Sequence, residues 1–186
     1  MIPKKRSKVG VSLRKTSRIR TIAFLGNYLP RKCGLATFTS DLLGAVAARH
    51  PQSRCFAVAV NDVEESYQYP EVVRFQIEEQ KLGSYRRAAD FLNSSDVDIV
   101  SVQHELGIFG GPAGSHLLAL LRGLTASVVT TLHTVLSKPN TDQSRVMQEL
   151  LKRSKRLVVM TERGRTILQE VLLLCLSRIR TNNTFA

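Results

Sequence analysis

The chain has 186 residues, 43% of them hydrophobic, which is enough for one domain with a buried core but not for two large ones. Its net charge of +12 would suit a nucleic-acid-binding protein, but residues 1–20 hold 8 of the 27 basic residues and no acid. The other 19 basic residues face 15 acidic ones, a charge of only +4, so we expect no specific nucleic-acid binding.

Short apolar runs alternate with helical patterns along the rest of the chain. The runs are continuously apolar, as in strands that are covered on both faces of a parallel sheet. The alternation predicts a single α/β domain with a doubly wound, Rossmann-like parallel sheet. In chain order we expect strands at Thr21–Gly26, Cys55–Val60, Val72–Ile77, Val97–Glu105, Ala126–Thr134 and Arg156–Thr161, and helices at Ala36–His50, Ser84–Ser95, Gly114–Leu124, Asp142–Lys155 and Glu162–Val171.

The two ends of the chain differ from this pattern. Residues 1–17 form a basic segment that we expect to be a flexible tail, and 18–171 is the predicted domain. Residues 172–186 begin apolar and turn polar, so we interpret them as an atypical tail after a frayed helix, without a further strand.

The basic segment lacks the apolar stretch of a secretion signal. Three interpretations stay open for it: a solvated tail without specific function, contact of residues 1–20 with an anionic membrane surface, and targeting. No apolar run is long enough to predict a membrane span. The three cysteines have no CxxC spacing, so neither a disulfide framework nor a zinc site is predicted. We expect a cytoplasmic protein, peripheral to the membrane if the basic segment binds lipid.

Ligands of a doubly wound sheet bind beyond the carboxyl ends of its strands. The first loop at that edge carries Arg31 and Gly34 just before a predicted helix, whose N-terminus favours anions. Gly34 would let the backbone approach a phosphate, and Arg31 adds positive charge. The loop matches neither GxGxxG nor a Walker A sequence, so a phosphate site and a simple turn both remain open.

Two histidines lie at the ends of predicted strands on the same edge. His133 has a near-neutral pKa that suits hydrogen bonding or proton transfer at a substrate hydroxyl, and a purely structural histidine is the alternative. The pair His104–Glu105 presents the same choice. Glycines in the loop that follows, among them Gly110 and Gly111, fit either an adaptable ligand loop or an ordinary connection. GxSxG, HExxH and paired-aspartate signatures are absent, which argues against a hydrolase elbow or a metal centre.

Taken together, these segments resemble the amino-terminal domain of retaining glycosyltransferases of family 4, which have the two-domain GT-B fold. The likeness covers residues 18–171 with the segments in the right order. They are PRKCGLATFTSDL after the first strand, DIVSVQHELGIFGG around the fourth, VVTTLHTVLSKP around the fifth and LVVMTERGRTIL around the sixth.

The resemblance implies transfer of a sugar from a nucleotide-sugar to an acceptor hydroxyl with retained configuration, with no metal or other cofactor. It assigns Gly34 and Arg31 to the donor phosphates, and His133 to the transferred sugar as the catalytic residue. The positions that it assigns to the acceptor or sugar are Gln103, His104, Glu105, Phe109, Gly110 and Gly111.

The sequence departs from the family in two respects. Cys33 stands where many members have a further glycine, and the motifs of the donor-binding carboxy-terminal domain have no counterpart. We therefore expect a truncated, acceptor-side half that is inactive alone and meets the missing domain or a second copy. The alternatives are a non-catalytic module that binds carbohydrate or a partner and, less favoured, a basic nucleic-acid-binding protein.

Overall fold

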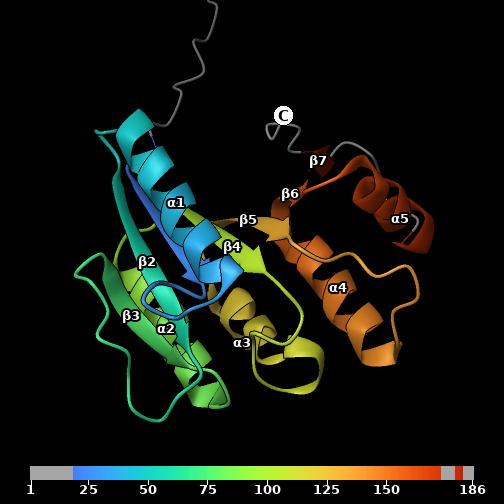
Figure 1. Ribbon diagram of the computed structural model, residues 1–186, viewed down its shortest axis with the longest axis horizontal. Coiled ribbons are helices and arrows are strands. Elements are labelled where there is room, and N and C mark those ends of the chain that lie inside the picture. The colour runs from blue at the N-terminus through green and yellow to red at the C-terminus, as the bar shows by residue number, and fades with distance from the viewer. Residues whose placement is uncertain (1–18, 173–178, 182–186) are drawn as a thin grey trace, which may run out of the picture.

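The computed structural model describes residues 19–172 and 179–181. In these residues seven parallel strands form one sheet in the order β3-β2-β1-β4-β5-β6-β7. The order runs outward from β1 in both directions, which confirms the doubly wound fold (Figure 1). The strands are β1 (Thr21–Gly26), β2 (Arg54–Asn61), β3 (Val73–Glu78), β4 (Ile99–His104), β5 (Ser127–Leu132), β6 (Ser154–Val159) and β7 (Ile179–Thr181).

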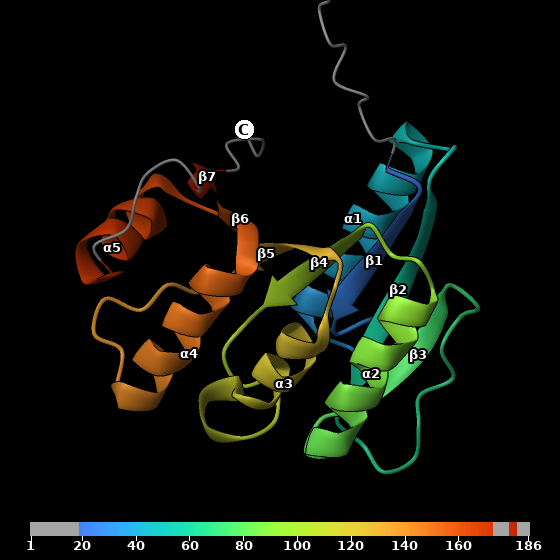
Figure 2. The same cartoon turned by 180° about the vertical axis from the view of Figure 1, so that it is seen from behind.

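Helices cover both faces of the sheet. One face carries α1, whereas α2, α3 and α4 lie side by side on the other, as the opposite views in Figures 1 and 2 show. The α-helices are α1 (Gly34–Arg49), α2 (Leu82–Ser94), α3 (His116–Gly123), α4 (Thr141–Arg153) and α5 (Glu162–Leu172), and a short 3-10 helix (Pro112–Gly114) precedes α3.

The continuous apolar runs reflect burial on both faces of the central strands. Phe24 and Ala57 belong to the core beneath α1, whereas Leu25 and Val58 belong to the larger core beneath the other helices. Successive side chains of a strand point to opposite faces, so every position of such a strand must be apolar. Each large aliphatic side chain buried here contributes about 1.5–3 kcal/mol relative to an exposed one.

The structure corrects two expectations near the C-terminal end. The helix expected to run through Lys155 ends at Arg153, because Ser154 already belongs to β6 and its hydroxyl bonds that of Thr130 on β5 at 2.7 Å. The expectation that no strand follows the last helix is wrong, since β7 pairs in parallel with β6. A three-residue strand is too short to show a periodic pattern.

The predicted flexible tail at 1–17 and most of 172–186 lie outside the described residues. None of the described helices is long and apolar enough to cross a membrane.

Candidate functional site

The start of α1 and His133 lie at the same edge of the sheet. Gly34 opens α1 after β1, and His133 follows β5, on the far side of β4. Phe38 lies one helical turn beyond Gly34, and its ring meets the His133 imidazole edge to face, with centroids 4.7 Å apart. The two segments that the sequence analysis assigned to one ligand are therefore close in space.

Gln103 holds the His133 ring and indicates its tautomer. The Gln103 Nε2 donates to Ser101 Oγ at 3.0 Å, which leaves Oε1 as the acceptor facing His133 Nε2 at 3.2 Å. Assigned from this network, the imidazole proton lies on Nε2, so Nδ1 keeps a lone pair. Burial lowers the pKa of His133, an effect that the nearby Glu105 partly opposes. A neutral imidazole of this kind can accept a hydrogen bond from a hydroxyl at Nδ1.

Glu105 joins the ends of two neighbouring strands. Its Oε2 accepts from Thr134 Oγ1 at 2.9 Å, and its Oε1 accepts from the Leu106 N–H at 2.8 Å. Both carboxylate oxygens thus bind the loops after β4 and β5. This arrangement fixes the backbone around His133.

His104 lies inside the protein rather than on the open edge. Its side chain is 1% exposed and stacks on Phe109, and neither ring nitrogen has a hydrogen-bond partner. Burial, with a smaller contribution from His133, lowers the pKa of His104 to about 4. The imidazole is therefore neutral at physiological pH and acts as part of the core.

The glycines after β4 allow a close approach to β3. The Gly110 N–H donates to Tyr85 Oη at 2.9 Å, and that hydroxyl donates to the Glu79 carbonyl, also at 2.9 Å. A Cβ on Gly110 would lie 2.0 Å from the Glu79 oxygen, and one on Gly111, whose φ is +77°, would meet the His116 ring at 2.6 Å. Tight packing, rather than adaptability, requires glycine at both positions.

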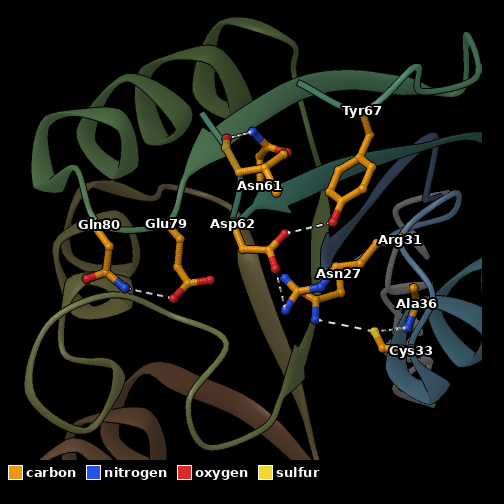
Figure 3. Close-up of polar contacts among 10 residues, drawn as sticks. Asn27, Arg31, Cys33, Ala36, Asn61, Asp62, Tyr67, Glu79 and Gln80 are labelled. Carbon is orange, nitrogen blue, oxygen red and sulfur yellow. Dashed lines mark hydrogen bonds and ion pairs between the residues drawn. The ribbon is translucent and has the colours of Figure 1, made fainter. Parts of the chain in front are cut away.

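Arg31 is engaged by neighbouring side chains (Figure 3). Its Nη1 donates to Asn27 Oδ1 at 3.1 Å, and its Nη2 lies 3.1 Å from Asp62 Oδ2. Tyr67 donates to the other oxygen of the same carboxylate at 3.1 Å. The Arg31 side chain is only 18% exposed, so a phosphate could bind it only by sharing or displacing Asp62.

The N-terminus of α1 faces open space. Cys33 caps the helix, with Sγ accepting from the Ala36 N–H at 3.4 Å. Gly34 is exposed, and a Cβ built on it would meet no atom within 4 Å. The N–H groups of Ala36 and Thr37 already donate to Cys33. The N–H groups of Gly34 and Leu35 are therefore the donors that this end can offer to an anion.

The structure adds residues that sequence reasoning missed. Phe38 lies four residues after Gly34 on one helix face, a spacing that could have identified it. Asp62 and Glu79 directly follow β2 and β3, and the rule that strand ends form the ligand edge would have included them. In the described part of the chain, no cluster of metal-ligating side chains is found.

No protein-family model matches the chain, and no curated protein matches it. Nineteen chains of solved structures match it in a structural comparison. One is an α-glucosyltransferase in complex with UDP and a 13-mer DNA, with a TM-score of 0.60 and 13% identity over 88% of this chain and 41% of that one. Another is the lipopolysaccharide outer core galactosyltransferase WaaB in its apo form, with a TM-score of 0.59 and 9% identity over 86% of this chain and 44% of that one.

At these identities the likeness concerns the fold. The chain has the α/β fold of one part of a glycosyltransferase. It spans less than half the length of either neighbour.

Proposed function

We propose that this chain is the acceptor-side half of a retaining glycosyltransferase that takes a sugar from a nucleotide-sugar. The proposal depends on one observation: the N-terminal part of α1 contacts His133. The ring centroids of Phe38, in the second turn of that helix, and His133 are 4.7 Å apart. The fold shared with two sugar transferases supports it. Retention of configuration is taken from the family 4 resemblance.

Each part of the edge has a role in this proposal. The open N-terminus of α1, beginning at Gly34, would receive the donor diphosphate through its N–H groups and positive dipole end. His133 Nδ1 would accept a hydrogen bond from a hydroxyl of the transferred sugar, while Gln103 holds the ring in place. Arg31 would reach a phosphate only after its ion pair with Asp62 rearranges.

The neighbours' greater length suggests that transfer needs a second, donor-binding part. One sheet edge cannot enclose a diphosphate or exclude water from the reacting centre, and much of an enzyme's rate comes from that enclosure. We therefore propose that the 186-residue chain binds its ligands but turns them over only with such a counterpart.

Binding of UDP and UDP-glucose tests the proposal, because the α-glucosyltransferase neighbours were found with these ligands. We expect His133→Ala to weaken UDP-glucose binding about tenfold, the loss of one good hydrogen bond, and to leave UDP binding within about twofold. His50→Ala, on an exposed residue after α1, is the matched control. Calorimetric titration measures both affinities, and circular dichroism checks folding.

Two results would overturn the proposal. One is the absence of UDP and UDP-glucose binding to the chain, alone or with an added donor-binding domain. The other is equal loss of UDP and UDP-glucose affinity in the His133 variant, which would place the imidazole away from the sugar.

A further inference from the structure

A hollow of about 410 Å³, lined mostly by polar and charged residues, lies between the carboxyl ends of β2 and β3. It opens beside the Arg31–Asp62 pair, which connects it to the loop before α1 (Figure 3). Its volume suits a small sugar-sized molecule. The lining residues are Asn61, Asp62, Val63, Glu64, Glu78, Glu79, Gln80 and Lys81.

Two of the carboxylates that line the hollow have cationic partners. Asp62 pairs with Arg31, and Glu78 pairs with both Lys81 and Arg87. These carboxylates are already neutralised by the protein, so they exert little attraction on a ligand.

Glu79 has no such partner. Within the described ranges no lysine, arginine or histidine lies within ion-pair distance of its carboxylate, whose Oε1 accepts only from Gln80 Nε2, at 2.8 Å. Burial is the main cause of a raised pKa for Glu79, and Arg31 only partly opposes it. The charged form is therefore poorly solvated, and a cation placed in the hollow would stabilise it.

A second polar group of the lining also lacks a donor. The Asn61 side chain is 6% exposed, and its Nδ2 donates to the Val63 carbonyl at 2.6 Å. Its Oδ1 has no hydrogen-bond partner among the described residues. The unmatched groups of the lining thus include Glu79, Asn61 and the exposed Glu64, which takes part in no ion pair among the described residues. All three are acceptors, and the ligand that complements them is a donor with positive charge.

We propose that this hollow binds an amine-bearing sugar, whose protonated amine pairs with Glu79 and whose hydroxyls donate to the other oxygens of the lining. Calling this sugar the acceptor rests on the proposed function, but its binding does not. The Glu79 carboxylate, which has no cationic partner among the described residues, would repel an anionic acceptor such as a sugar phosphate or DNA.

Three sugars that differ in charge test the inference by NMR titration of the full chain. We expect glucosamine to bind at least about tenfold more tightly than glucose, the gain of one charge-assisted hydrogen bond, and glucose 6-phosphate to bind most weakly. Glu79→Gln should remove the advantage of glucosamine. Asp90→Asn changes net charge equally on an exposed residue of α2 and should preserve it.

A second test does not depend on the folding of the Glu79 variant. N-acetylglucosamine has a neutral amide in place of the charged amine, so the charge is removed from the ligand rather than from the protein. This sugar should bind no better than glucose. Equal binding of glucosamine and glucose, or an advantage that survives Glu79→Gln, would overturn the inference and leave a solvated acidic surface. Failure of UDP-glucose binding with glucosamine binding intact would overturn only the proposed function.

Discussion

The Arg31 guanidinium is bound on two sides, by Asn27 within its own loop and by Asp62 beyond β2. The sequence predicts a basic loop at a ligand edge, and that is where the residue lies. It cannot predict the ion pair, because Asp62 is distant in the chain and becomes a neighbour only when β1 and β2 pair. Whether a charged side chain is available to a ligand thus depends on tertiary contacts.

Buried His104 leads to a prediction on pH-dependent stability. Its pKa falls from 6.5 to about 4 on folding, so the neutral form contributes stability that is complete above pH 6.5 and is lost as pH falls towards 4. Between pH 7 and 4, the free energy of unfolding of the wild type should fall by roughly 3 kcal/mol more than that of His104→Phe. Urea unfolding at a series of pH values measures this.

His50→Gln is the matched control for this titration, because it also removes one histidine but from an exposed position. Parallel profiles for the wild type and the His104 variant would contradict the burial of a neutral imidazole.

Secondary-structure elements follow closely from local patterns where they are long. The six longer strands and five α-helices appear where the apolar runs and helical spacing predict them, because each pattern reports burial on one or both faces. The differences lie at ends: α1 begins at Gly34 rather than Ala36, and α4 gives way to β6 at Ser154. Such ends depend on capping and neighbouring strands, which periodicity does not encode.

Replacing each of two glycines by alanine tests whether close packing or access for a ligand explains why a loop contains glycine. Gly110→Ala should destabilise the protein by about 2–4 kcal/mol, because the new Cβ would overlap the Glu79 carbonyl that Tyr85 also binds. Gly34→Ala should be neutral or stabilising by up to about 0.5 kcal/mol, since alanine favours the helix and its Cβ meets nothing. Urea unfolding compares the two. An equal loss in both variants would contradict the difference in packing.

At the scale of the whole molecule, the sequence predicts a parallel, doubly wound sheet but not which strands are neighbours. The order β1-β4-β5 brings α1 against the loop after β5, and so produces the Phe38–His133 contact. The resemblance assigned Gly34 and His133 to one donor sugar phosphate, but it predicted neither the Phe38 contact nor the hollow between β2 and β3. The character of this hollow depends on which side chains form ion pairs across the sheet edge and which, like Glu79, do not. Such pairs are visible only in the three-dimensional structure.

The uneven charge of the chain gives a prediction for the whole molecule. Deleting residues 1–17 removes six basic residues and no acid, so the net charge falls from +12 to +6. Binding to vesicles that contain anionic lipid should then weaken at least about tenfold, because each Lys or Arg near such a surface contributes about 1 kcal/mol. Co-sedimentation with vesicles at low and high salt measures this, and the full chain should release at high salt because screening shortens the attraction. Vesicles of neutral lipid are the control. Equal retention of the full and shortened chains on anionic vesicles would contradict the prediction. It would mean that either the folded domain or no part of the chain contacts the membrane.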